Sequence, residues 1–269
     1  MPAPAHPHHL QLTLANGLRV SLRHAPRLKR CAAALRVAAG SHDVPLAWPG
    51  LAHFLEHLLF LGTERFPASE GLMAYVQRHG GQVNASTRER TTDFFFEVPV
   101  SAFDAALDRL GDMLAHPRLA LEDQLREREV LQAEFIAWSQ DAVAQQQQAL
   151  LQGVAPDHPL RAFHAGNRDS LPVEREAFQQ ALRDFYEGFY QTGQMTLSLA
   201  GPQPLEELQS IAQRFSEMLK PGQLRAQAPA PALMAGSQVI YQHADEHHWH
   251  HVVTGDASPE ALDFLCLWL

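Results

Sequence analysis

Two histidines and a glutamate lie close together in the segment HFLEH at residues 53–57. If residues 50–61 form a helix, His53 and His57 lie one turn apart on the same face, and Glu56 shares that face. Two imidazoles one turn apart can chelate one metal ion, and a carboxylate beside them can hold or deprotonate a water molecule. The chain contains 16 histidines, so such pairs also arise by chance, and a catalytic zinc site still requires a third ligand.

The third ligand has several candidates in the segment 121–153, which we expect to form one long helix. The glutamates in its first half are Glu122, Glu127, Glu129 and Glu134. Glu127 and Glu134 are seven residues apart and therefore lie on one face of a helix. The residue types alone leave the choice among these four carboxylates open.

Hydrophobic periodicity predicts the elements that position these residues. Asn16-Gly17 between the first two strands is typical of a hairpin. Ser69 is a candidate N-cap for the second helix, and Ser101 with Asp104 resembles a capping box for the third. Strands are expected at residues 9–14, 18–24, 30–39, 82–88, 91–100 and 195–200, and helices at residues 50–61, 67–79, 101–116, 121–153, 173–190 and 204–219.

The expected elements define an α+β fold, because strands and helices occur in clusters joined by hairpins. We expect a first domain at residues 1–223, a linker rich in alanine and proline at residues 224–235, and the start of a second domain at residues 236–269. The apolar C-terminal segment FLCLWL is typical of a surface that packs against a partner. We therefore expect the chain to be a fragment of a longer protein.

Composition places the chain among globular proteins and excludes some functions. Of its 269 residues, 46% are hydrophobic and 19% are charged. A net charge of -9 without a lysine and arginine cluster argues against nucleic-acid binding. We expect no leader peptide and no membrane-spanning segment, since no apolar run is long enough, and Cys31 and Cys266 lack metal-ligand spacing. We expect reduced thiols and a cytoplasmic location.

Several motifs follow one another in a fixed order along the chain. The order His-x-x-Glu-His is the signature of the inverzincins, and 76 residues separate His57 from Glu134, the last residue of REREVLQAE. Between them lies GGQVNAST at residues 80–87, and HPL at residues 158–160 precedes GN at residues 166–167. On these motifs the chain resembles the M16 (pitrilysin/insulinase) metallopeptidases over residues 10–219.

The resemblance implies a role for each motif residue. His53, His57 and Glu134 would hold one Zn²⁺ ion per chain, and Glu56 would be the general base that activates water. Glu127 would orient a ligand histidine or support Glu134; the alternative is an ordinary solvated charge on the helix. A purely structural zinc site is a further alternative, although such sites normally have four protein ligands.

The resemblance also implies that GGQVNAST is a substrate-binding edge strand and that the fold is an M16-type domain, a mostly antiparallel sheet packed on one side by helices. Main-chain groups of the strand would pair with an extended peptide, with little dependence on the peptide's sequence. An ordinary buried hairpin is the alternative. The residues expected to contact the peptide are Asn84, Ala85, Ser86 and Thr87.

The activity that the resemblance implies is that of a zinc-dependent endopeptidase cleaving small peptides. The segments 51–77, 80–99 and 163–172 are similar to the peptidases of bacterial pyrroloquinoline quinone (PQQ) biosynthesis, which implies the small PQQ precursor peptide as substrate. The alternatives are an M16 peptidase with a broader peptide-degrading role and a non-catalytic peptide-binding or assembly subunit.

A partner half is also implied by the resemblance. Larger family members close a chamber with a second half of similar fold, which adds an arginine and a tyrosine to the active site, and others use a second M16-type subunit. We therefore expect the chain alone to bind zinc but to show weak or no peptidase activity.

A cluster of histidines near the C-terminus is a separate feature. In a strand, His248 and His250 would point the same way and could bind metal. We favour a polar edge or loop that binds metal only adventitiously. The cluster comprises His243, His247, His248, His250 and His251.

Overall fold

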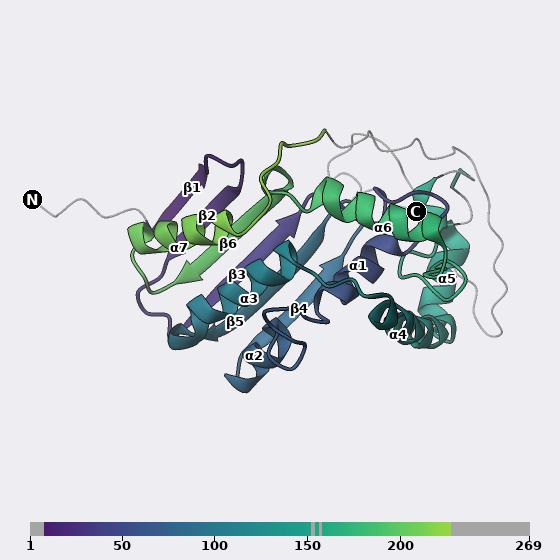
Figure 1. The fold of residues 1–269 in the computed structure, drawn as a ribbon, viewed down its shortest axis with the longest axis horizontal. Helices are drawn as coiled ribbons and strands as arrows, with labels where there is room; N and C mark the ends of the chain where they lie inside the picture. The colour runs from purple at the N-terminus through teal and green to yellow at the C-terminus, as the bar shows by residue number, and fades with distance from the viewer. Residues whose placement is uncertain (1–7, 152–153, 156–157, 227–269) are drawn as a thin grey trace, which may run out of the picture. The chain divides into compact units, whose positions relative to one another are not determined.

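The structure is a computed structural model, and it describes residues 8–151, 154–155 and 158–226 (Figure 1). The chain divides into two compact units, one made of residues 1–136 and 162–228 and the other of residues 137–161 and 229–269. All the described strands and all the candidate site residues belong to the first unit. The expected start of a second domain at residues 236–269, with its histidine cluster, lies outside the described residues.

The first unit contains a six-stranded sheet with the strand order β1-β2-β6-β3-β5-β4. Neighbouring strands are antiparallel, except that β2 and β6 run parallel. The predicted α+β class and the mostly antiparallel sheet are therefore confirmed, and β4 forms one edge. The strands are β1 His9–Thr13, β2 Arg19–His24, β3 Arg30–Val37, β4 Gln82–Thr87, β5 Thr92–Pro99 and β6 Met195–Gly201.

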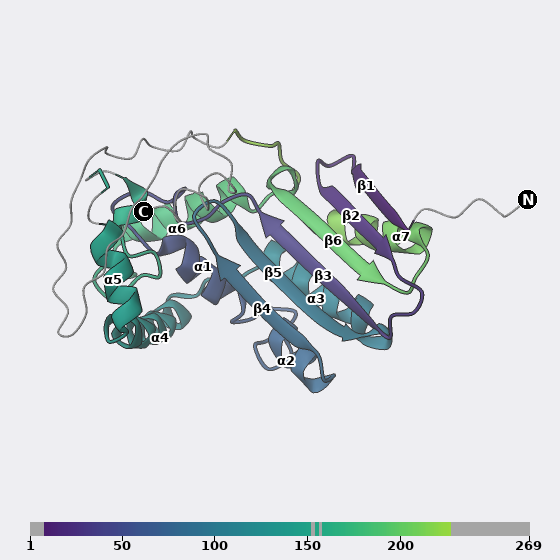
Figure 2. The ribbon, with the colours of Figure 1, turned by 180° about the vertical axis from the view of Figure 1, so that it is seen from behind.

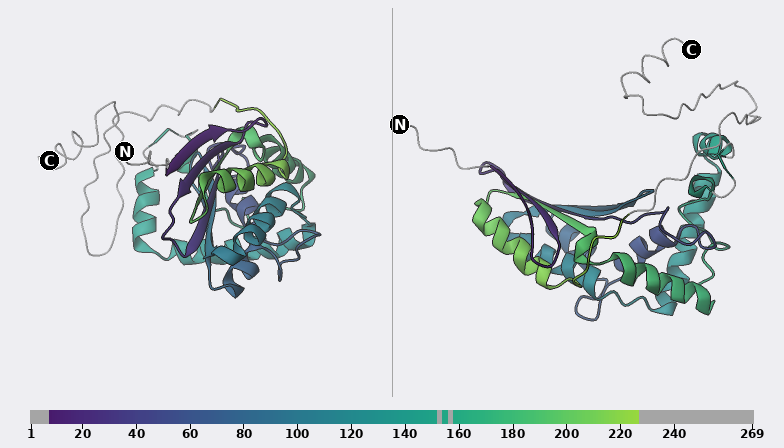
Figure 3. Two further views of the ribbon diagram at one scale, coloured as in Figure 1. Left: turned by 90° about the vertical axis from the view of Figure 1, so that its left-hand side faces the viewer. Right: turned by 90° about the horizontal axis from the view of Figure 1, so that it is seen from above.

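Helices cover one face of this sheet. Figures 1 and 2 show α2, α3 and α7 on that face, and Figure 3 shows the same layer from the edge of the sheet. No described helix of this unit covers the opposite face. Among the described helices, none is long and apolar enough to cross a membrane. The helices are α1 Leu51–Leu59, α2 Leu72–Arg78, α3 Phe103–Ala115, α4 Leu121–Ser139, α5 Ala142–Leu151, α6 Glu176–Phe189 and α7 Leu205–Glu217, with short 3-10 turns at Val100–Ala102, Pro159–Arg161 and Thr192–Gln194.

The two-residue period of the strands separates the core from the open face. In β5, Phe94 and Phe96 are buried toward the helices, whereas Phe95 between them is 41% exposed on the other face. Cys31 on β3 is a buried free thiol in the same core. Large buried rings such as Phe54 join the sheet to the helices, so the core fixes where α1 lies.

The long helix predicted at residues 121–153 is wrong, because two helices, α4 and α5, occupy this region. The helical hydrogen bonding stops at Gln140 and Asp141. The Asp141 carboxylate accepts the backbone N–H of Ala144 at 2.7 Å, as an N-cap residue does, and so begins a new helix. Aspartate at this position favours a helix start over a helix interior.

Both serine caps predicted from the sequence are also wrong. Residues 67–70 form a turn closed by the bond from Glu70 N–H to the Pro67 carbonyl, so α2 begins only after Gly71, without a side-chain cap. Ser101 lies inside a 3-10 turn, and α3 follows Ala102, again without a side-chain cap. In both places a local turn replaces the expected capping bond.

Candidate metal centre and catalytic site

Helix α1 carries His53 and His57 on the one stripe of its surface that is not apolar. Its apolar side chains, such as those of Phe54 and Leu58, are at most 2% exposed, so packing fixes the rotation of the helix. The Nε2 atoms of the two histidines lie 3.2 Å apart, and the ring centroids are 4.6 Å apart. The predicted spacing of one helical turn therefore brings both imidazoles to one point.

The outer nitrogen of each imidazole has its own partner. Nδ1 of His53 donates to the carbonyl of Ala165 at 2.9 Å, and Nδ1 of His57 donates to Oε1 of Glu127 at 2.7 Å. A carbonyl and an ionised carboxylate can only accept, so we assign the proton of each neutral ring to Nδ1. Both Nε2 lone pairs then face each other, and a metal cation between them would satisfy both.

Glu134 of α4 completes a set of three candidate ligands. One ligand atom from each of His53, His57 and Glu134 lies within 4.8 Å of the other two. Oε1 of Glu134 is 3.9 Å from Nε2 of His57. Ligand atoms about 2.0–2.2 Å from a tetrahedral zinc ion are about 3.3 Å apart, so a small shift of the half-exposed Glu134 side chain suffices. Two imidazoles and one carboxylate with a fourth position open are the ligands of catalytic zinc sites.

Negative charge surrounds the two imidazoles. Burial disfavours the charged form of His57, but the hydrogen bond to Glu127 and the charges of Glu134, Glu127 and Glu56 outweigh this effect, and the pKa of His57 is raised above its ordinary value. The same three carboxylates would stabilise a bound metal cation. The electrostatics of the site therefore agree with its ligand geometry.

Glu56 lies beside the ligand histidines and is itself buried, with 7% of its surface exposed. Its Oε2 accepts a hydrogen bond of 2.6 Å from the hydroxyl of Thr87 on β4. Burial, reinforced by the charge of Glu56, raises the pKa of the Tyr190 phenol far above its ordinary value, so this phenol remains neutral. Glu56 is thus a buried carboxylate that adjoins both the two histidines of α1 and the edge strand β4.

The edge strand β4 presents its main chain and its side chains in different directions. The Arg88 N–H donates to the Thr91 carbonyl at 2.8 Å, so these two residues form a hydrogen-bonded pair. Along an antiparallel ladder, hydrogen-bonded pairs alternate with pairs whose main-chain groups point away from each other. From the register of β4 and β5, Val83, Ala85 and Thr87 therefore direct their N–H and C=O groups to the free edge. The Ala85 N–H is bonded to Oδ1 of its neighbour Asn84 at 2.9 Å.

Of the four residues predicted to contact substrate, Ala85 and Thr87 direct their main-chain groups to the free edge, whereas Asn84 and Ser86 use theirs to pair with β5. Asn84 lines the open face of the sheet, whereas Thr87 meets Glu56 on the helix side.

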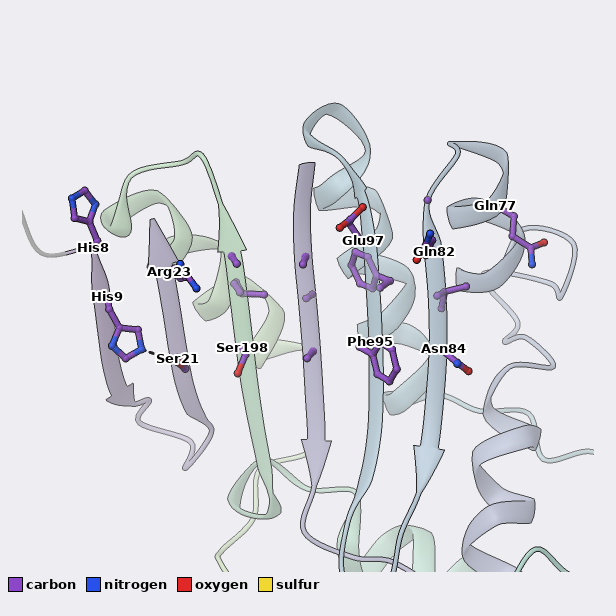
Figure 4. A pocket seen from close by; sticks show the side chains of 18 residues that line it. His8, His9, Ser21, Arg23, Gln77, Gln82, Asn84, Phe95, Glu97 and Ser198 are labelled. Carbon is purple, nitrogen blue, oxygen red and sulfur yellow. Dashed lines mark hydrogen bonds between the residues drawn. The ribbon is translucent and has the colours of Figure 1, made fainter. Parts of the chain in front are cut away.

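A hollow of about 1100 Å³ occupies the open face of the sheet (Figure 4). Small side chains of β3 and β6, including Ala32, Ala34 and Ser198, form its floor, and Phe95 and Glu97 stand at its side. It reaches β4 at Gln82 and Asn84 but contains none of the metal-ligand candidates. This hollow was not predicted from the sequence. Its sequence signal is the pair of small residues Ala32 and Ala34, which lie on one face of β3.

Sequence reasoning also missed the partner of His53. The Ala165 carbonyl is a main-chain group of a loop that lies 112 residues from His53 in the chain. Such a group carries no side-chain signature, so only the nearby motif GN at residues 166–167 pointed to this loop.

Two facing glycines hold that loop against the start of α1. Gly50 has φ +91°, and a Cβ atom there would lie 2.3 Å from the Gly166 Cα atom. Gly166 itself has φ +83°. The close backbone contact therefore depends on the missing side chain at position 50.

Gly50→Ala is expected to lower the free energy of unfolding by about 2–4 kcal/mol and to weaken zinc binding, because it combines backbone strain with displacement of the loop that supports His53. Gly80→Ala is the matched control: Gly80 has φ +63°, but nothing lies within 4 Å of an added Cβ atom. The control should lose only about 1 kcal/mol and keep its zinc affinity. Urea unfolding and a chelator competition titration measure both quantities; equal effects of the two substitutions would contradict this account.

The family model described as "Insulinase (Peptidase family M16)" matches residues 19–162, and the model "Peptidase M16 inactive domain" matches residues 178–261. A curated relative, Coenzyme PQQ synthesis protein F of Pseudomonas protegens, is 63% identical over 256 residues, which are 94% of this chain and 31% of that protein. Protease 3 of Escherichia coli is 36% identical over 203 residues, 75% of this chain and 21% of that protein.

Solved structures give the same result. The crystal structure of pitrilysin superimposes with a TM-score of 0.76 at 32% identity, covering 84% of this chain and 24% of pitrilysin. The chain spans about a third of the length of the PQQ synthesis relative, 31% for the protein of Pseudomonas protegens. With a family model that matches more than half of its residues, the chain belongs to the M16 (pitrilysin/insulinase) peptidase family.

Proposed function

We propose that this chain provides the zinc site and the general base of a metalloendopeptidase that cleaves small peptides. The observation that carries the proposal is the convergence of His53, His57 and Glu134 beside the buried carboxylate of Glu56. Zinc bound there would polarise the scissile carbonyl and acidify a water molecule. One ion per chain corresponds to the single group of three ligand candidates among the described residues.

The residues around the ion have separate tasks in this proposal. Glu56 takes a proton from the attacking water and delivers it to the nitrogen of the departing amine. Glu127 and the Ala165 carbonyl hold the Nδ1 protons, so that both imidazoles keep Nε2 free for the metal.

The peptide binds as an added strand at the edge of β4 in this proposal. The outward main-chain groups of Val83, Ala85 and Thr87 would supply the hydrogen bonds. The strand ends at Thr87, whose side chain contacts Glu56, so a peptide paired with it would pass next to the base.

The proposed substrate is the small precursor peptide of PQQ. Relatives at 60–63% identity carry the name Coenzyme PQQ synthesis protein F, which supports this choice. A broader peptide-degrading role is the second candidate, supported by the 36% identity to Protease 3. A non-catalytic peptide-binding subunit is the third, but the complete set of ligand and base candidates favours an enzyme.

The proposed organisation has a catalytic domain at residues 1–223, a linker at 224–235 and the start of a second M16-like domain at 236–269. Because the chain spans about a third of the length of its relatives, we propose that a further half or a second M16-type subunit completes the active site. A bacterial cytoplasmic location remains part of the proposal.

The experiment is cleavage of synthetic PQQ precursor peptide by the full-length protein, alone and with candidate M16-type partners. Mass spectrometry should find internal cleavage that a chelator abolishes and that one equivalent of zinc restores. Unrelated peptides of equal length test whether the protein cleaves only the PQQ precursor peptide or a broader range of peptides. A zinc-loaded protein that cleaves none of these peptides under any of these conditions would overturn the proposal.

A further inference from the structure

Thr87 joins two parts of the site that have so far been described separately. Its hydroxyl donates to Oε2 of Glu56 at 2.6 Å. Its main chain belongs to the free edge of β4, where an added peptide strand would pair. One residue therefore contacts the base through its side chain and faces the substrate position through its backbone.

The alternation of β4 explains why this side chain reaches Glu56. Val83, Ala85 and Thr87 share the face of the strand on which the helices pack, and α1 contacts β4 there. Thr92, which is opposite Thr87 in the register, donates its hydroxyl to the Ala39 carbonyl at 2.9 Å. The two threonine hydroxyls thus have separate acceptors, and that of Thr87 is committed to Glu56.

The hydrogen bond leaves one carboxylate oxygen of Glu56 available. In the described part of the chain, the Thr87 hydroxyl is the one donor to the Glu56 side chain, and it occupies Oε2. The β-branched threonine in a strand has few rotamers, so this contact restrains the carboxylate plane. The free oxygen, Oε1, is then held in a single direction instead of exchanging with Oε2 by rotation.

We propose that Thr87 is a positioning residue, which holds Glu56 so that its free oxygen faces the attacking water and links this orientation to the strand where the peptide binds. This assignment rests on the proposed peptidase function. It adds to the main-chain contact predicted from sequence a separate role for the side chain, which acts on the base.

The test compares Thr87→Val, which removes the hydroxyl and keeps the shape, with Thr87→Ser, which keeps the hydroxyl. In the full-length protein, Thr87→Val should lower kcat about 10- to 100-fold with KM and bound zinc unchanged, because a misdirected base loses part of its contribution. Thr87→Ser should recover most of the rate. Thr13→Val, at an exposed position on the distant edge strand β1, is the matched control and should equal the wild type.

A second measurement does not depend on activity. This measurement uses the zinc-free protein and compares the urea midpoint of unfolding in two backgrounds. Introduced alone, Thr87→Val should lower the midpoint. Introduced together with Glu56→Leu, it should lower the midpoint less, because Glu56→Leu has already removed the hydrogen bond between the two side chains. Equal shifts in both backgrounds would overturn the contact. If the wild type cleaves no peptide but the shifts differ, the proposed function fails while the contact stands. Unchanged kcat in Thr87→Val, loss of zinc, or failure of Thr87→Ser to recover would each overturn the positioning role.

Discussion

Glu56→Gln is expected to retain zinc and to lose peptide hydrolysis, with kcat lowered about 10²- to 10⁴-fold. Glutamine has nearly the shape of glutamate, and its carbonyl oxygen can still accept the Thr87 hydroxyl, so the buried side chain stays in place. An amide cannot take a proton from water, so the base function alone is removed. Zinc stoichiometry by atomic absorption and single-turnover cleavage by the full-length protein measure the two halves of this prediction.

Glu64→Gln is the control for this variant, because Glu64 is an exposed glutamate shortly after α1. It should match the wild type in zinc content and rate. Cleavage by Glu56→Gln at the wild-type rate would place the base elsewhere. A wild type that binds zinc and cleaves nothing would favour the non-catalytic peptide-binding subunit.

Glu127→Ala is expected to raise the zinc dissociation constant about 10- to 100-fold. The Glu127 side chain is 14% exposed, and its carboxylate holds Nδ1 of His57 at 2.7 Å. Without this acceptor the imidazole can rotate or move its proton to Nε2, which removes the lone pair that would bind the metal. Competition with a chromophoric chelator at fixed pH measures the change.

Glu122→Ala, on the same helix, is the matched control. Its side chain is 76% exposed and lies 3.9 Å from Arg118, so its loss should leave zinc affinity unchanged. If both substitutions leave the affinity unchanged, Glu127 is an ordinary solvated charge, which is the alternative considered from the sequence.

The local part of the site was predictable because it depends on short-range geometry. His53 and His57 meet because helical spacing places them one turn apart, and Glu134 was selected through the family spacing from His57. The family prediction is confirmed by the model that matches residues 19–162. The catalytic roles remain predictions that the variants above test.

The long-range part was not predictable from patterns. The parallel pairing of β2 with β6 joins residues such as Val20 and Leu197, which no local period connects. The Ala165 carbonyl is likewise far from its partner His53, at a separation of 112 residues. The break at Asp141 was missed because strong helix formers on both sides outweighed one capping residue in the pattern.

The outer edge of β4, which pairs with no other described strand, has a consequence for which polypeptides the site could accept. Pairing with Val83, Ala85 and Thr87 would require a stretch of about 13 Å of substrate main chain that is extended and free of its own hydrogen bonds. A segment inside a helix or a sheet meets this requirement only after local unfolding, which costs free energy. The Ala85 N–H, moreover, would have to exchange its bond to Asn84 for one to the peptide. Folded proteins would thus be spared, and a disordered segment would be cleaved according to its local flexibility more than its side chains.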